Sequence, residues 1–500
     1  MPSQPAPHGP QRLLLLFNIA LLVSLEFVQN GAVSFAAAFI SGGIGAAPEE
    51  FSLAAAVYAA TAVVMIFKHR WLVEQLGYRH FIRLSLALFV LGGVLCALSS
   101  NVGEFIGARF VQALGGSAFF TAGRVQVNRF QGADRGTAVK FMVFGIVLGS
   151  GATPWLASVL LEHHAWQGVF LLPLPLAAGA VLLSETTLED VVPHDSRSEL
   201  HLGGTLLLAA VAFSLQFVLE RMQYDLFAEP WLLWLVGALA LGGLLAFLFH
   251  EHGRERPLLP FRQFGGERYR SGLVMYGICY LVLSASYYML PMFMTRGLGF
   301  GLLSTGALLG ATSAFALLPV LVHFRLVRRF PAQRKYMVLA FLMLAGFGFE
   351  MSRMSPEVSQ WQLVLPLLAL SCFSAFGQGT AAMNAYVGID DDVFSHAYQT
   401  KNMLRELLNS TGISLATIVL QSRSSLHYQR MVERLDAVTL ANAGMPLAHV
   451  PTQQDAPMLQ AFASQITQQA TQLACLDFFR ALVWLAAGAM FIAVLQRKIR

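Results

Sequence analysis

The chain has 500 residues, of which 56% are hydrophobic and only 12% are charged. Soluble domains average about 25% charged residues, so this composition excludes an ordinary soluble domain and predicts an all-α membrane protein. The formal net charge of +5 does not indicate nucleic-acid binding, because basic residues gathered in short loops on one side of a membrane orient its helices instead.

Apolar runs along the chain predict fourteen transmembrane helices, since roughly 20 residues cross a bilayer. The predicted spans lie near residues 13–35, 52–67, 81–99, 104–123, 138–161, 167–184, 203–219, 231–249, 271–293, 303–323, 336–352, 361–388, 402–421 and 477–496. The start of the chain lacks the short apolar core and cleavage site of a signal peptide, so we expect the first run to stay in the membrane.

The lysine and arginine residues predict the orientation. An even number of spans puts both chain ends on one side, and the loops on that side hold 25 of the 33 Lys and Arg residues, against 6 in the opposite loops. Cytoplasmic loops carry such an excess. We therefore expect a multi-pass protein of the bacterial inner membrane with both termini in the cytoplasm.

The loop lengths predict the domain boundaries. Residues 1–184 are expected to form an N-terminal six-helix bundle, and the polar, acidic segment 185–202 a cytoplasmic linker. Two inserted helices should follow in 203–249, and a C-terminal six-helix bundle in 250–500.

A long outer loop, residues 422–474, lies within this last bundle. Its pattern predicts two amphipathic helices, near 427–438 and 457–473, separated by a segment rich in helix breakers. The hypotheses are a helical cap on the bundle or a docking surface for a periplasmic partner.

The sequence has no motif that indicates an enzyme. It contains no HExxH zinc motif, no GxSxG nucleophile motif and no phosphate-binding GxxxxGK. Its four cysteines, Cys96, Cys279, Cys372 and Cys475, are not spaced as metal ligands. No catalytic residue, metal site or cofactor is therefore predicted.

Two charged residues, Glu26 and Arg109, fall deep within predicted spans. At about 1.5 Å per residue, both lie about 21 to 22 Å from the cytoplasmic surface. An unpaired charge is costly at that depth, so we predict that Glu26 and Arg109 form an ion pair. The pair would either couple transport to protons or fix the packing of two helices.

Other polar and aromatic residues are candidates for a cavity. Gln29 and Gln112 lie one helical turn beyond the two charges and could line the same space. Aromatic residues of later spans, Tyr287, Tyr288 and Phe376, could line a greasy pocket. Asn402, Arg405 and Glu406 open the thirteenth span, where a cytoplasmic gate or an interfacial anchor is expected.

Several segments resemble the major facilitator superfamily, in particular its fourteen-helix drug:proton antiporter branch of the EmrB and QacA type. The loop after the second span is similar to the family's Gly-x-Leu-Ala-Asp-Arg-x-Gly-Arg-Arg loop at Glu74, Gly77 and Arg79. In the fourth span, Arg109 and Gln112 resemble the family's Arg-x-x-Gln motif. The resemblance implies a cytoplasmic gating loop and pseudo-symmetric halves arranged as six, two and six helices.

The fifth span resembles the family's antiporter motif, Gly-Pro-x-x-Gly-Gly. The residues concerned are Gly149, Thr153, Pro154, Ala157 and Ser158. All are small or kink the helix, which suits close packing. The resemblance implies that this span seals against the opposite half and suppresses proton leak.

Two more segments are similar to the family. Glu220 and Arg221 end the seventh span, with Glu220 in place of Asp, and Asn402 and Arg405 match a motif of the thirteenth. The long outer loop is similar to that of EmrB-type components of tripartite pumps. This implies a periplasmic adaptor of the membrane-fusion class and an outer-membrane channel as partners.

We therefore expect proton-coupled export of hydrophobic or amphiphilic compounds by alternating access, in the manner of multidrug efflux. The partners would be a small amphiphilic substrate, protons and membrane lipids. One alternative is a dedicated exporter of one endogenous metabolite, such as a siderophore or fatty acid. The other is a transporter-like sensor.

Overall fold

A computed structural model describes residues 9–46, 48–163, 166–188, 201–225, 230–252, 266–384, 389, 391–433 and 456–495. Its regular elements are all helices, as the composition predicts. The core of the predicted linker, 189–200, and the breaker segment of the outer loop, 434–455, lie outside the described residues.

The N-terminal half holds six spans, two of them broken. Its helices are α1 (Pro10–Gly43), α2 (Pro48–Leu76), α3 (Tyr78–Leu98), α4 (Val102–Gly116), α5 (Phe119–Val127), α6 (Gly132–Glu162), α7 (Gly168–Leu171) and α8 (Leu174–Thr187). The α4–α5 span breaks directly after two glycines, which weaken a helix interior. The α7–α8 span breaks at Pro173, which has no backbone N–H to donate.

The rest of the chain adds two inserted spans and a C-terminal half. The inserted spans are α9 (Leu202–Asp225) and α10 (Pro230–His252). The C-terminal half contains α12 (Glu267–Met292), α13 (Leu302–Ala314), α14 (Leu317–Arg329), α15 (Gln333–Met351), α16 (Gln360–Phe373), α17 (Gly379–Asn384), α18 (Asp391–Glu433) and α20 (Ala456–Leu495). Two π-helical turns, η1 (Phe293–Gly297) and η2 (Ser374–Gln378), continue α12 and α16.

With the broken spans joined, these helices make the fourteen spans that the sequence predicts. Eleven of the described helices are long and apolar enough to cross a membrane by composition alone. The other three are the α4–α5 span, which is broken into two short helices, and the helices α15 and α18. The prediction of an all-α membrane fold with fourteen spans is confirmed.

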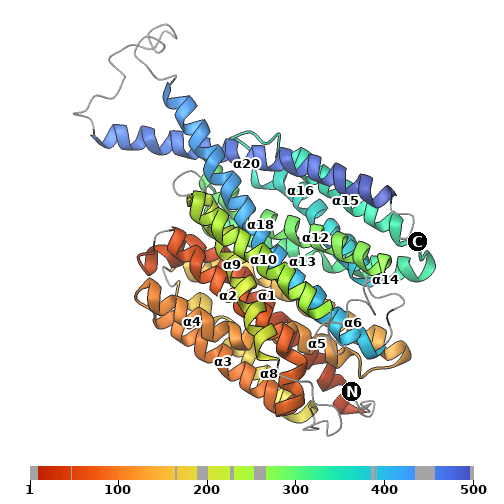
Figure 1. Ribbon diagram of the computed structural model, residues 1–500. Helices are drawn as coiled ribbons and strands as arrows, with labels where there is room; N and C mark the ends of the chain where they lie inside the picture. The colour runs from red at the N-terminus through yellow and green to blue at the C-terminus, as the bar shows by residue number, and fades with distance from the viewer. Residues whose placement is uncertain are drawn as a thin grey trace.

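Figure 1 shows the two halves side by side, with α9 and α10 across their junction. The halves meet where α6 packs against α13 and where α2 packs against α18. Helix α9 contacts both α2 and α18, so an inserted helix touches both halves. The start of α1 and the end of α20 lie at one end of the bundle, which we call the terminal face; the opposite end is the far face (Figure 1).

The last two predicted spans correspond to helices that are longer than the spans. Helix α18 is continuous to Glu433, and α20 begins at Ala456 rather than near residue 477. The two amphipathic helices predicted in the outer loop are therefore extensions of these membrane helices. Both extensions project beyond the bundle at the far face (Figure 1). Asp477 of α20 joins them by accepting hydrogen bonds from Arg423 at 2.7 Å and His427 at 2.8 Å.

Candidate functional site

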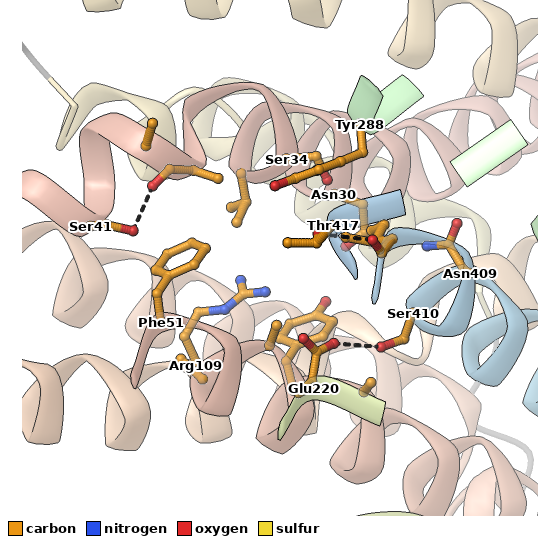
Figure 2. A pocket seen from close by; sticks show the side chains of 18 of the residues that line it. Asn30, Ser34, Ser41, Phe51, Arg109, Glu220, Tyr288, Asn409, Ser410 and Thr417 are labelled. Carbon is orange, nitrogen blue, oxygen red and sulfur yellow. Dashed lines mark hydrogen bonds between the residues drawn. The ribbon is translucent and has the colours of Figure 1, made fainter. Parts of the chain in front are cut away.

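Two adjoining cavities lie between the halves, with volumes of about 370 and 180 Å³. Asn30, Ser34, Tyr288 and Asn409 line both of them. The larger cavity extends along α1 and α2 to residues near the far face, including Ser41 and Phe51 (Figure 2). The space between the halves is therefore reached from the far face.

The terminal side of these cavities is closed by contacts between α5 and α18. The rings of Phe120 and Tyr398 stack with centroids 6.3 Å apart. Asn402 donates a hydrogen bond to Thr121 at 3.0 Å. Near the terminal face, Arg70 of α2 lies 3.1 Å from the ring nitrogen of His396. Asn402 thus lies in a contact between the halves.

The floor of the smaller cavity holds an ionic cluster that the sequence analysis did not predict. Arg405 of α18 pairs with Glu26 of α1 and with the neighbouring Glu406. All three side chains are buried and line this cavity. Two carboxylates therefore share one guanidinium, and one of these ion pairs links the N-terminal half to the C-terminal half.

The break between α4 and α5 provides another contact for Glu26. The first turn of a helix has backbone N–H groups without partners inside the helix. At the start of α5, the Phe120 N–H donates to the Glu26 carboxylate at 3.1 Å. The Arg405 guanidinium also lies over the Phe120 ring, 4.1 Å from the ring centroid.

The ion pair predicted between Glu26 and Arg109 does not form. Arg109 instead donates to Gln112 Oε1 at 2.6 Å and lies over the Tyr58 ring, 4.0 Å from its centroid. Among the described residues, no carboxylate lies within ion-pair distance of Arg109. The side chain is 5% exposed and lines the larger cavity (Figure 2).

Glu220, on the inserted helix α9, also lines the larger cavity. Its carboxylate accepts hydrogen bonds from Ser410 at 3.2 Å and Ser414 at 2.9 Å, both on α18. Helix α2 lines the same cavity with Ala54, Ala55 and Ala59 and with the rings of Phe51 and Tyr58. The sequence motif marked Glu220, but only the fold shows that it faces the cavity.

The other predicted cavity residues divide into two groups. Tyr287 lines the smaller cavity and Tyr288 lines both. Gln29 and Gln112 are fully buried and line neither cavity, and the Gln29 side chain has no hydrogen-bond partner among the described residues. Phe376 packs against His323 and Tyr336 within the C-terminal half, away from these two cavities.

The predicted gating loop lies at the terminal face. Glu74 is buried and accepts a hydrogen bond from Arg70 at 2.8 Å. Gly77 has φ 78°, a backbone conformation that favours glycine, and it lets α3 begin directly after α2. Arg79 donates to the Leu188 carbonyl at 2.7 Å, and this bond ties the loop to the end of α8.

The predicted antiporter motif of α6 packs against two neighbours. Gly149 faces Ser24 and Phe27 of α1, and Thr153 faces Gly31. On the other side, Pro154 and Ser158 contact Gly306 of α13 in the opposite half. The motif residue Ala157 is fully buried in this packing. Pro154 also lines the smaller cavity.

Three site residues were missed or misplaced by the sequence analysis. Asn30 and Asn409 line both cavities, and the signal for each was an amide within an apolar span. Arg405 was expected near the cytoplasmic surface but lies at the centre with Glu26. Arg221, next to Glu220, is partly buried and lines neither cavity.

Comparison with known proteins agrees with this architecture. The family model described as the Major Facilitator Superfamily matches residues 19–403. A protein of Klebsiella pneumoniae named "Putative multidrug resistance protein MdtD" is 25% identical over 410 residues, covering 81% of this chain and 85% of that protein. The Cronobacter sakazakii protein of the same name is also 25% identical, over 412 residues.

Solved structures show the same fold at low sequence identity. A bacterial homologue of the human lysosomal transporter Spinster superposes with a TM-score of 0.65 at 12% identity, covering 99% of both chains. The nucleoside transporter NupG superposes with a TM-score of 0.59 at 12% identity, covering 96% of this chain and 99% of NupG.

Proposed function

The chain belongs to the major facilitator superfamily and is a multi-pass membrane transporter, and on that premise we propose that it exports hydrophobic or amphiphilic compounds in exchange for protons. The carrying observation is the Glu26–Arg405–Glu406 cluster at the floor of a cavity that is closed toward the terminal face. The multidrug-resistance name of its relatives supports efflux as the physiological task.

The lining of the larger cavity suits an amphiphile. Phe51, Tyr58 and Tyr288 supply aromatic surface, while Asn30 and Asn409 supply amides. Apolar walls with a few convergent polar groups are typical of small-molecule sites. A volume of about 370 Å³ is also within the usual range for such sites.

The ionic cluster supports proton coupling. Two carboxylates on one guanidinium leave one negative charge in excess, which a proton can neutralise. A proton on Glu26 removes the charge that holds α1 to Arg405 of α18. Proton binding then weakens a link between the halves, as a proton-driven change of access requires.

The proposed cycle follows from the sides on which the cavity is open and closed. The excess of Lys and Arg residues puts the terminal face in the cytoplasm, so the far face is the outer one. In this state the cavity loses substrate to the outside and takes up a proton. Opening of the α5–α18 contacts then exposes the cluster to the cytoplasm, where the proton leaves, driven by about 2.3 kcal/mol per charge per 100 mV.

Location and partners follow from the same orientation. The protein lies in the bacterial inner membrane with both termini in the cytoplasm. The far-face extensions of α18 and α20 then project into the periplasm, where they would meet an adaptor of the membrane-fusion class that leads to an outer-membrane channel.

The Glu26→Gln variant tests the proton coupling. In proteoliposomes with an imposed pH gradient, we expect this variant to lose proton-linked flux of an amphiphilic dye while it still inserts and binds the dye. The control is Glu185→Gln, which removes an exposed carboxylate paired with Arg83 on α3, away from the cavity. The control should transport like the wild type.

Full activity of Glu26→Gln would remove the cluster from the mechanism. The substrate range is tested separately, by exposing a deletion strain to a panel of toxic amphiphiles. Broad hypersensitivity is expected. Unchanged resistance to the whole panel would contradict multidrug efflux and favour a dedicated exporter.

A further inference from the structure

Arg109 and Glu220 are two buried charged residues that the proposed proton cycle does not use, and both line the larger cavity. They come from different parts of the fold, α4 of the N-terminal half and the inserted helix α9. Figure 2 shows both side chains directed into the same space.

The Arg109 guanidinium has donors to spare. Arginine carries five N–H donors. One Arg109 amino group donates to Gln112 Oε1, and the guanidinium face rests on Tyr58. With no carboxylate within ion-pair distance among the described residues, its charge is uncompensated, which is costly inside a membrane protein.

The Glu220 carboxylate is a buried negative charge without a cationic partner among the described residues. Its partners in the described structure are two hydroxyl groups, from Ser410 and Ser414, and both donate to the same oxygen, Oε1. The other oxygen is left for the cavity. No lysine or arginine of the described residues lies within ion-pair distance of this carboxylate, which is 6% exposed.

The surface around these two residues is mostly apolar. Phe51, Tyr58 and Ile413 line it, together with the small residues of α2. The cavity has two other charged lining residues: Glu406, which is paired with Arg405, and Arg296, which is exposed. A ligand with a single charge would compensate one of the two residues and leave the other uncompensated. A ligand that carries both charges on an apolar frame compensates both.

We propose that Arg109 and Glu220 are the two charged contacts of a binding site for zwitterionic amphiphiles. The anionic group of the ligand binds Arg109, its cationic group binds Glu220, and its apolar part lies against the aromatic lining. This assignment rests on the proposed export function and narrows its substrate class. It also gives the inserted helix α9 a role in substrate recognition.

Three probes of equal chain length test the assignment: 8-aminooctanoate, octanoate and octylammonium. Binding of each radiolabelled probe is measured by equilibrium dialysis against purified protein in amphipol, with empty amphipol as the blank. We expect the wild type to bind the zwitterion about tenfold more tightly than either singly charged probe, the change expected for one added charged contact.

Two variants should each remove one of the two charged contacts and so lower the affinity for the zwitterion. Arg109→Gln should reduce the affinity for the zwitterion about to that for octylammonium, and Glu220→Gln about to that for octanoate. The controls are Arg353→Gln, an outer arginine over the Phe349 ring, and Glu185→Gln. Both controls should keep the wild-type preference.

The assignment is overturned if the wild type binds either singly charged probe as tightly as the zwitterion. This comparison needs no variant, so a folding defect of Arg109→Gln cannot obscure it. The assignment is also overturned if a folded Arg109→Gln or Glu220→Gln variant keeps the full preference. Probe preference without proton-linked flux would refute the export proposal alone, and flux without preference would refute this assignment alone.

Discussion

Arg405 compensates the charges of two buried carboxylates, Glu26 and Glu406, at once. Removing one partner of a buried ion pair leaves an uncompensated charge, which typically costs about 3 to 5 kcal/mol. Arg405 also links the halves, so its loss should affect both stability and transport.

We expect Arg405→Gln to lower the unfolding free energy by about 3 kcal/mol and to stop transport. Thermal unfolding of the purified protein measures the first effect. Adding Glu26→Gln to this variant should restore part of the lost stability, because it removes one of the two stranded charges. An unfolding temperature equal to that of the wild type would mean that Arg405 does not compensate these carboxylates.

Sequence reasoning at this scale identified the intramembrane charges but not their partners. The prediction that Glu26 and Arg109 lie inside the bundle is correct, because a charged side chain within an apolar span is costly in lipid and usually faces the protein interior. Their predicted pairing was wrong because equal depth does not fix the direction of a side chain around its helix. The apolar pattern starts the thirteenth span at 402, but α18 begins at Asp391, so Arg405 lies further from the start of the helix than the pattern predicts.

At the scale of elements, a close approach between the halves involves Gly306 of α13. A Cβ at this position would lie 2.5 Å from the Pro154 carbonyl oxygen of α6 and even closer to Ser158. These atoms belong to the backbone and to a short side chain, so they cannot easily move aside. The two helices would have to separate.

We expect Gly306→Ala to cost about 1 to 3 kcal/mol of stability, the usual cost of overpacking. It should also increase proton leak through vesicles, because a wider gap between α6 and α13 admits water. The matched control is Gly346→Ala on α15, where a Cβ would meet nothing within 4 Å. Equal leak in the two variants would show that this contact does not seal the protein.

Apolarity predicted where the helices cross the membrane but not where they begin and end. Helices α18 and α20 continue outside the predicted spans through polar sequence, and a hydropathy pattern marks only the part that lies in lipid. The break between α4 and α5 was not predicted either, although Gly115 and Gly116 precede it. That break matters for the site, because it places the Phe120 N–H on Glu26.

At the scale of the whole molecule, the space between the halves is closed at the α5–α18 contact and is reached from the far face. A transporter that alternates access must open the closed side during each cycle. A covalent link across the α5–α18 contact should therefore hold the protein in one state.

We expect the Thr121→Cys and Asn402→Cys pair, in a background without the four native cysteines, to stop transport when it is crosslinked. Reduction should restore transport. The control pair, Asn18→Cys and Ser184→Cys, joins α1 to α8 within one half, where two short native side chains already meet at 3.2 Å. That crosslink should leave transport unchanged. Continued transport with the first pair fully crosslinked would contradict alternating access through this contact.

The length of α18 has a mechanical consequence. One unbroken helix connects Glu406 at the cavity floor to Glu433 beyond the bundle, a reach of about 40 Å at 1.5 Å per residue. A tilt of about 10° at its buried part moves its tip by roughly 7 Å over that reach. A change of charge at Glu406 that tilts α18 would therefore displace the outer tip of the helix, and a partner bound at that tip would be expected to slow transport.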